Sequence, residues 1–262
     1  MTMESQEHSD SFTFSPIGVV RSCYRAKFGI PRQPGLIREA RGEIVLLPPC
    51  NQPEALRGLE EFSHIWVLFV FNENLRQGWK ATVRPPRLGG DKRLGVFATR
   101  APFRPVPIGL SAMRLEGIRH GEHGRLSLEV SGLDLVDGTP VLDIKPYLPY
   151  TDIIQDAVGG FASSAPESML EVTVSAAAEK QFSRCRPDFR TLCMKVVAAD
   201  PRPAYQREAG REYQCFLEDR EVIWKVDEEN PLKAEILRLE YAQGKKPPRR
   251  KKPEPEGGAP VT

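Results

Sequence analysis

The sequence lacks the patterns that mark membrane, disulfide-rich and zinc-binding proteins. No run reaches the roughly 18 to 20 apolar residues that a membrane-spanning helix requires, and the polar, acidic start of the chain does not resemble a secretory or organellar leader. The five cysteines are odd in number and show neither CxxC nor Cys/His metal spacing. We therefore expect reduced thiols, no metal cofactor, no membrane partner and a cytoplasmic location.

Histidine is scarce, with four residues, and the glycine-rich nucleotide loops are absent. Gly89 and Gly90 are adjacent but fit neither the GxxxxGK[ST] order nor the GxGxxG spacing, so the usual cue for a Rossmann-like site is missing. His64 starts an apolar run, where a structural histidine is more common than a catalytic base. No Ser/His/Asp or Cys/His set can be assembled, which disfavours covalent hydrolysis.

Proline, in contrast, is abundant, with 24 residues among 262, and this favours short strands and turns over long helices. Seven short apolar runs bounded by Gly and Pro predict a barrel or sandwich. These expected strands are Ile17–Tyr24, Glu43–Leu47, Ile65–Phe71, Gly95–Thr99, Ile108–Leu115, Arg125–Val130 and Pro140–Leu148. The run from Ile65 has no polar face and is expected to be a central strand.

One helix is expected between these strands, with Asn51 as its cap, Pro53 in its first turn and Leu56, Leu59 and Phe62 on one face. A second unit of helices and strands follows. The expected helices are Ser175–Arg186 and Asp188–Ala199, and the expected strands are Glu212–Leu217, Val222–Val226 and Ile236–Tyr241.

The predicted fold class is mainly β, with an N-terminal β-barrel and a small α+β C-terminal domain. The composition shifts along the chain set the expected boundaries. They are a disordered N-terminus over 1–13, the barrel over 14–150, a linker over 151–168, the α+β domain over 169–243 and a basic disordered tail over 244–262.

The net charge is only +2, but cations are concentrated between Val83 and Gly109. Six cations there face a single acid, Asp91; they are Arg84, Arg87, Lys92, Arg93, Arg100 and Arg104. A solvated basic loop is the simpler interpretation. The flanking prolines and glycines fix the backbone shape, however, which favours a surface that faces phosphate or another anion.

A second cluster, from Leu133 to Tyr147, is rich in aspartate. Asp137-Gly138 is an ordinary turn signal, and a plain hairpin is one interpretation. The other is a site in which Asp134, Asp137 and Asp143, with Lys145 and Tyr147, bind a cation, hydrogen-bond a ribose or transfer a proton.

A set of ordered motifs carries a resemblance to a known family. They are Pro31–Gly35, Gly58–His64, Arg84–Arg87, Gly95–Arg100, Phe103–Gly109, Asp134–Pro140, Asp143–Tyr147 and, further along, Asp200–Tyr205. Together they closely resemble the TsaA-like family (UPF0066) over about residues 14 to 150, and again in the second unit.

The resemblance implies a homodimeric β-barrel enzyme that uses S-adenosylmethionine to methylate N6 of N6-threonylcarbamoyladenosine at position 37 of tRNA-Thr. It also implies the positions of the cofactor contacts. These are Pro31, Arg32, Gln33, Asn72, Glu73, Arg100, Leu110, Asp137, Gly138, Thr139 and Pro140.

Roles for these residues follow from their chemistry. Glu73 or Asp137 can bind ribose hydroxyls or the amino group of the cofactor, Leu110 can cover its adenine, and Arg100 or Arg32 can meet its carboxylate. The catalytic candidates that can accept the N6 proton are Asp137, Asp143 and Tyr147, and the threonyl carboxylate of the substrate is another acceptor. The RNA-binding candidates are Arg84, Arg87, Lys92, Arg93 and Arg104.

Two alternatives stay open. One is a non-catalytic RNA-binding barrel that takes no methyl donor. The other is a metal-assisted phosphohydrolase that uses the aspartate-rich turn, which is disfavoured because these acids have no histidine nearby in the sequence.

Overall fold

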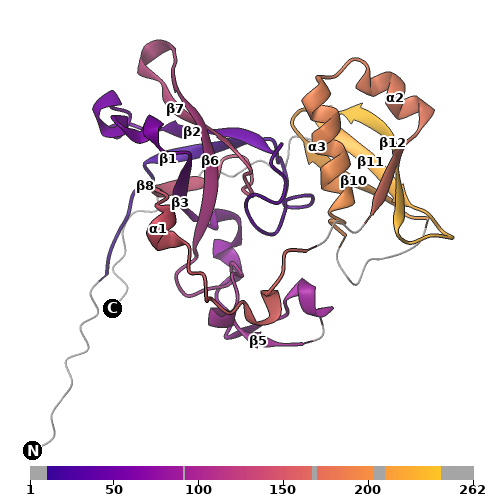
Figure 1. The fold of residues 1–262 in the computed structure, drawn as a ribbon, viewed down its shortest axis with the longest axis horizontal. Coiled ribbons are helices and arrows are strands. Elements are labelled where there is room, and N and C mark those ends of the chain that lie inside the picture. Colours follow the sequence, from indigo (N-terminus) through magenta and orange to yellow (C-terminus); the bar gives the residue numbers. More distant parts are fainter. Residues whose placement is uncertain (1–10, 91, 167–169, 203–209, 243–262) are drawn as a thin grey trace, which may run out of the picture.

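The computed structural model describes residues 11–90, 92–166, 170–202 and 210–242, and it is mainly β, as the sequence predicts. Figure 1 shows a barrel in the N-terminal part and a smaller sheet with helices in the C-terminal part. Residues 1–10 and the basic tail lie outside the described residues, so the disorder expected there stays a prediction. Within the described ranges, no helix is long and apolar enough to cross a membrane.

Six antiparallel strands close the barrel in the order β1-β2-β7-β6-β3-β8. They are β1 (Gly18–Ser22), β2 (Arg41–Leu46), β3 (His64–Val70), β6 (Ile108–His120), β7 (Leu126–Ser131) and β8 (Pro140–Pro146). In β3, Ile65, Val67 and Phe69 are buried in the barrel, and the side chains between them form its outer face. Strands pair with β3 on both sides, which confirms its expected central position.

Close packing inside the barrel requires a glycine on β6. Gly109 pairs with Phe69 across the β3–β6 ladder, and a Cβ atom at Gly109 would clash with the Phe69 ring. That ring also packs edge-on against Phe71, with 4.9 Å between the ring centroids. Because Gly109 has no side chain, the rings of Phe69 and Phe71 can pack at this end of the barrel.

The strand expected over Gly95–Thr99 is wrong. Only its first residue is in a strand, the short β5 (Leu94–Gly95), which pairs with β4 (Thr82–Val83). The chain then makes the 3₁₀ turn η5 (Val96–Ala98), closed by hydrogen bonds from the N–H and the hydroxyl of Thr99 to the carbonyl of Val96. Because the Val96 carbonyl accepts these two hydrogen bonds, it is not available to pair with a neighbouring strand.

The single helix expected from Asn51 to Phe62 is also wrong. The segment forms two short 3₁₀ turns, η1 (Pro53–Leu56) and η2 (Leu59–Glu61). Gly58 lies between them with φ 85°, a left-handed conformation that ends a helix. Asn51 is not the cap, because Gln52 holds that position and the Asn51 amide donates instead to the carbonyl of Gly124.

The C-terminal unit is a four-stranded sheet in the order β10-β11-β12-β9, with two helices. Its elements are β9 (Glu171–Val174), α2 (Ala176–Phe182), α3 (Pro187–Ala198), β10 (Glu212–Leu217), β11 (Arg220–Val226) and β12 (Lys233–Tyr241). Strand β9, which the sequence pattern misses, is only four residues long and adds in parallel to β12. Helix α2 ends at Phe182, four residues before the expected Arg186, and the backbone of Arg186 itself is extended, as Pro187 favours.

The barrel and the C-terminal sheet touch where the residues after β1 meet the end of β10. Tyr24 bridges to Leu217, and the N–H of Glu218 donates a 2.7 Å hydrogen bond to the carbonyl of Cys23. Residues 151–168, the expected linker, hold the end of α1 (Pro149–Asp152) and the 3₁₀ turn η7 (Gly160–Ala162). The expected domain limits themselves stay predictions.

Candidate functional site

The connections at one end of the barrel gather the candidate residues. Strands β1, β3 and β7 end there, and β2, β6 and β8 begin there, so residues 23–40, 71–107 and 132–139 all emerge at this end. We call it the mouth. In Figure 1 it faces the β5 segment at the bottom, while the β6–β7 hairpin rises at the opposite end.

Every cofactor position that the resemblance implies lies in these three connections or at the first residues of β6 and β8. Across the mouth, the Arg100 guanidinium donates a 2.6 Å hydrogen bond to the side-chain carbonyl of Gln33. The Lys27 ammonium lies 3.6 Å from the Glu73 carboxylate. Leu110, on the outer face of β6, is 49% exposed. The structure thus places the two connections 23–40 and 71–107 in direct contact.

Asp137 is held against β1. Its carboxylate accepts hydrogen bonds from the N–H of Ser22, at 3.1 Å, and from the Arg25 guanidinium, at 2.9 Å. The backbone continues this attachment, because the N–H of Gly138 donates to the carbonyl of Val20 at 2.6 Å, and Gly138 has φ 78°. The plain turn and the site interpretations of this segment are therefore compatible: the turn fixes the connection, and its residues line the mouth.

Asp134, in the same connection, points to β6. The Ser111 hydroxyl donates a 2.8 Å hydrogen bond to its carboxylate. Burial raises the pKa of the Asp134 carboxyl from 3.8 to about 6, while the Ser111 hydrogen bond and the positive charge of Arg100 act to lower it. Asp134 is therefore a titratable acid next to a residue that the resemblance assigns to cofactor binding.

The other two candidate proton acceptors lie away from the mouth connections. Asp143 is on β8, forms a 2.7 Å ion pair with Lys145 and pairs with Leu68. Leu68 also pairs with Leu110, so Asp143 is two strands, or about 10 Å, from Leu110. Asp143 is the fourth residue of β8 and so lies outside the 132–139 connection that carries Asp134 and Asp137.

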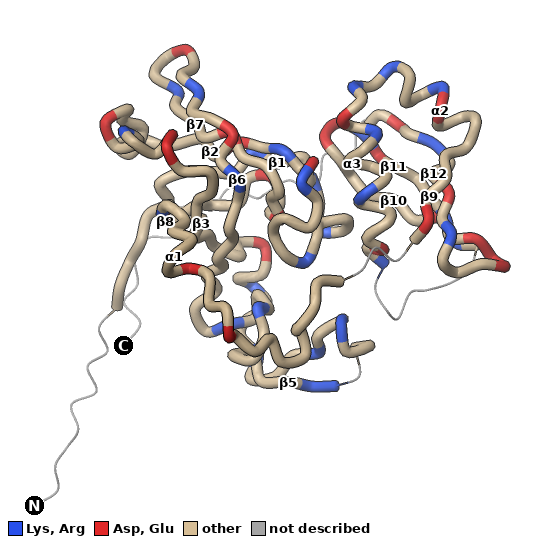
Figure 2. Tube along the Cα trace, in the orientation of Figure 1, with Lys and Arg blue, Asp and Glu red and all other residues tan. Residues whose placement is uncertain are grey.

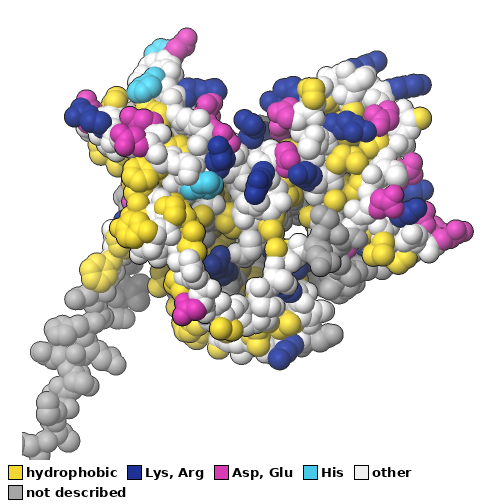
Figure 3. Space-filling model, viewed as in Figure 1, with side chains coloured by type: hydrophobic (Ala, Val, Ile, Leu, Met, Phe, Trp, Pro, Cys, Tyr) yellow, Lys and Arg dark blue, Asp and Glu magenta, His cyan; other side chains and the backbone are white. Residues whose placement is uncertain are grey.

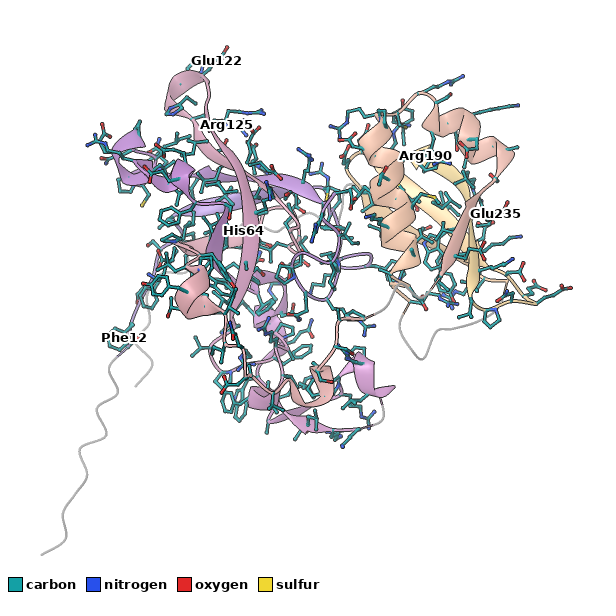
Figure 4. The ribbon with its side chains drawn as sticks, in the orientation of Figure 1. Phe12, His64, Glu122, Arg125, Arg190 and Glu235 are labelled. Carbon is teal, nitrogen blue, oxygen red and sulfur yellow. The ribbon has the colours of Figure 1, made fainter. Side chains whose placement is uncertain are left out.

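Tyr147 is at the opposite end of the barrel from the mouth. It follows β8 and packs on Trp66 and His64, with 5.4 and 6.3 Å between ring centroids. His64, labelled on β3 in Figure 4, also shares a 2.9 Å hydrogen bond with the Ser63 hydroxyl. These contacts agree with the structural role expected for His64.

The basic segment, residues 83–109, extends beyond the mouth around the β4–β5 ladder, where Figure 2 shows several Lys and Arg positions. Arg84, Arg87, Lys92 and Arg93 are exposed there. The Arg87 guanidinium reaches the Ser164 hydroxyl at 3.1 Å, and Arg93 reaches the Thr82 hydroxyl at 3.2 Å. Asp91, the one acid of this part of the sequence, lies outside the described residues. Figure 3 shows cations on the same lower part of the molecule.

Arg104, the fifth RNA-binding candidate, is placed differently. Its guanidinium donates hydrogen bonds to the carbonyls of Val96, at 3.1 Å, and Thr99, at 2.6 Å. It also lies 5.5 Å from the centroid of the Phe97 ring. Arg104 therefore holds the η5 turn.

Sequence reasoning missed two exposed aromatic residues of the 71–107 connection. Phe97 is 75% exposed and Trp79 is 58% exposed. Phe97 lies in an apolar run that predicts a strand, so no signal marked its ring as exposed. In the described residues there is also no cluster of three or more His, Cys, Asp or Glu side chains that could hold a metal ion.

The motif that begins at Asp200 forms a buried ion pair. The Arg202 guanidinium donates to both carboxylate oxygens of Asp200, at 2.6 and 3.0 Å, and both side chains are buried. Tyr205, the last residue of the motif, lies outside the described residues. The ion pair thus fixes the described part of the motif, residues 200–202, and a role of the motif near the active site stays untested.

Comparisons with known proteins agree with this architecture. The model of the tRNA-methyltransferase O N-terminal domain matches residues 19–153, and that of the TrmO C-terminal domain matches residues 167–240. An Escherichia coli protein named tRNA (adenine(37)-N6)-methyltransferase is 50% identical over 222 residues, which cover 82% of this chain and 94% of that protein. A Pseudomonas aeruginosa protein, named putative S-adenosylmethionine-dependent methyltransferase RcsF, is 52% identical over 215 residues, or 80% of this chain and 90% of that one.

A solved structure matches as well. A crystal structure of TrmO from Pseudomonas aeruginosa superposes with a TM-score of 0.71 and 42% identity, covering 88% of this chain and 99% of that chain. The domain models cover both sheet-based units, and the relatives match over most of their own length. On this evidence the chain belongs to the tRNA-methyltransferase O family.

Proposed function

We propose that this chain is an S-adenosylmethionine-dependent tRNA methyltransferase that methylates N6 of the adenosine at position 37. Membership of the family supports this function, as do relatives named tRNA (adenine(37)-N6)-methyltransferase. The observation that carries the proposal is the mouth, where the Arg100–Gln33 hydrogen bond joins two connections that are distant in the sequence. The finer substrate is N6-threonylcarbamoyladenosine in tRNA-Thr, as the motif resemblance implies.

The side chains of the mouth fit the chemical groups of S-adenosylmethionine. Arg100 and Arg32 can pair with its carboxylate, and Glu73 and Asp137 can accept from its amino group or ribose hydroxyls. The half-exposed Leu110 offers an apolar surface for the adenine. The bound cofactor supplies an electrophilic methyl group. The remaining proposed contacts are Pro31, Gln33, Asn72, Gly138, Thr139 and Pro140.

The protein has two tasks in such a reaction. It must hold the target nitrogen close to the methyl group, which by itself accounts for much of the rate enhancement in a bimolecular transfer. It must also allow the N6 proton to leave. A base with a pKa near 6 to 7 is suited to accept a proton at neutral pH.

Among the acids of the chain, we propose Asp134 as the base that accepts the N6 proton. It lies in the mouth, beside the strand that carries Leu110, and burial raises its pKa to about 6. Asp137 has its carboxylate engaged by Arg25 and the N–H of Ser22, which suits a positioning role. The competing acceptor is the threonyl carboxylate of the substrate itself.

The exposed cations of the basic segment form the proposed RNA surface. Arg84, Arg87, Lys92 and Arg93 would contact phosphates, and Arg104 would act indirectly by holding the segment. We also propose a homodimer, as the resemblance implies, and a cytoplasmic location, because the proposed substrate is tRNA. Light scattering of the purified chain tests the dimer.

Mass spectrometry of tRNA nucleosides after incubation with isotopically labelled S-adenosylmethionine tests the function. We expect the label in N6-methylated threonylcarbamoyladenosine from tRNA-Thr, and none in tRNA that lacks the threonylcarbamoyl group. Label in an adenosine that carries no threonylcarbamoyl group would contradict the proposed substrate. Calorimetric titration with the cofactor separates the enzyme from the alternative of a non-catalytic RNA-binding barrel, which would show no binding.

A further inference from the structure

The most exposed large hydrophobic ring of the basic segment belongs to Phe97, in the η5 turn. The backbone under this ring is fixed: Val96 is 1% exposed, and its N–H donates a 3.0 Å hydrogen bond to the carbonyl of Ala81. Thr99 closes the turn with two hydrogen bonds to the carbonyl of Val96. Phe97 is therefore presented to solvent from a rigid anchor.

One face of the Phe97 ring is supported from within the protein. The Arg104 guanidinium lies 5.5 Å from the ring centroid and is itself held by the carbonyls of Val96 and Thr99. A cation over one face of an aromatic ring is a favourable contact and restrains the ring. With the ring 75% exposed, much of it stays open to a ligand.

The surroundings select the class of ligand. Arg84 follows β4 and Arg93 precedes β5, so two exposed cations lie at one end of the short ladder whose other end leads into η5. On the other side, Arg100 follows Phe97 by three residues, at most about 10 Å along the chain. The ring thus lies between a phosphate-binding surface and the proposed cofactor site.

We propose that Phe97 is a stacking platform for an unpaired base of the RNA substrate next to the target adenosine. Proteins bind single-stranded nucleic acid with aromatic rings set among cations. The cations bind the phosphates, and the rings stack on the bases, because every base offers a π-face. An apolar protein partner would have to bury the same cations without compensating phosphates. This inference rests on the proposed function, since it needs an RNA substrate.

The test compares Phe97→Leu with Phe97→Trp in the full chain. The leucine variant keeps an apolar side chain but loses the π-face, whereas the tryptophan variant keeps it. The probe is an anticodon stem-loop RNA, and its binding is measured by fluorescence anisotropy. Tyr241→Leu is the matched control, because Tyr241 is an exposed ring with an arginine, Arg220, over one face at 3.5 Å, on β12 of the other sheet.

We expect F97L to weaken RNA binding about 5- to 150-fold, the range measured for losing one base–aromatic stack. F97W should bind RNA nearly as the wild type does, with its added indole fluorescence quenched by the RNA. F97L and F97W should keep the cofactor affinity and melting temperature of the wild type. Y241L should bind RNA as the wild type does.

Three results would overturn the inference. RNA binding by F97L equal to that of the wild type would show that no base stacks on the ring. A loss of cofactor affinity would place the ring in the cofactor site, and a change of oligomeric state would make it a contact between copies of the chain. If the wild type itself neither binds nor methylates tRNA, the proposed function fails instead.

Discussion

The Ser111 hydroxyl donates a 2.8 Å hydrogen bond to the Asp134 carboxylate and so joins β6 to the connection between β7 and β8. The bond stabilises the charged form of an acid whose pKa burial raises to about 6. Ser111 is itself buried, so water does not readily replace it. This pair therefore offers a way to change the pKa of Asp134 without removing its carboxyl group.

The first prediction concerns the pH dependence of methylation. If Asp134 accepts the N6 proton, kcat/KM should rise with pH through a limb near pH 6, and D134N should lower turnover while cofactor and RNA binding persist. S111A should move the limb to higher pH, since the charged carboxylate loses a hydrogen bond. A D134N enzyme with wild-type turnover would leave the substrate's own carboxylate as the acceptor. Asp188→Asn, on α3, is the control for the same chemical change.

The second prediction uses the same pKa shift but needs no activity. The pKa of Asp134 is higher in the folded chain than its ordinary 3.8, so the folded state binds more protons than the unfolded state between about pH 4 and pH 6. Stability from this group is therefore lost as pH rises through that window. D134N cannot titrate, so its melting temperature relative to the wild type should be higher at pH 7.5 than at pH 4. An equal difference at both pH values would contradict the raised pKa.

The third prediction concerns the proposed RNA surface. R84A/R93A should weaken tRNA binding and reduce the slope of log K against log salt by about 1.4 to 1.8, because two phosphate contacts are lost. The matched control is K180A/R184A, which removes two exposed cations from the region of α2. Equal salt slopes for the two double variants would place the RNA elsewhere. The readout is filter binding over a range of salt concentrations.

How far the sequence predicts this molecule depends on how local the signal is. The apolar run from Ile65 predicts a barrel strand, and side-chain burial along β3 follows the strand period. The alternation in Leu126–Val130 also predicts a strand, β7, in which Ser127, on the expected outer face, is buried as well. The helix expected from Asn51 fails at Gly58, where the periodicity continues but the backbone becomes left-handed. Pattern alone also cannot show that Tyr147 and the mouth lie at opposite ends, because that depends on the closed strand order.

The candidate site also depends on long-range contacts that the sequence pattern does not reveal. The sequence names Asp137, Asp143 and Tyr147 as proton acceptors and does not single out Asp134. Only the fold shows that Asp134 is buried against Ser111 and that Asp143 pairs with Lys145 on β8. The sequence does not predict that the Phe97 ring is exposed, because a phenylalanine in an apolar run is expected to be buried. Long-range contacts, rather than residue type, decide these cases.

The fourth prediction separates Arg104 from its neighbours. As a member of the basic segment, Arg104 is expected from its charge to bind phosphate, but in the structure its guanidinium donates to the carbonyls of Val96 and Thr99. R104A should therefore lower stability, by about 1 to 3 kcal/mol for the loss of charge-assisted hydrogen bonds to buried backbone. R93A removes an exposed side chain and should leave stability within about 0.5 kcal/mol of the wild type.

Chemical denaturation of the two variants measures this difference. If R104A is as stable as the wild type and loses RNA affinity with a reduced salt slope, Arg104 is a phosphate contact and the turn does not depend on it. If it is destabilised, its RNA affinity should fall with little change in salt slope, because the lost contribution is then the position of Phe97 rather than a released counterion. The salt slope thus distinguishes a residue that meets RNA from one that holds the residue that does.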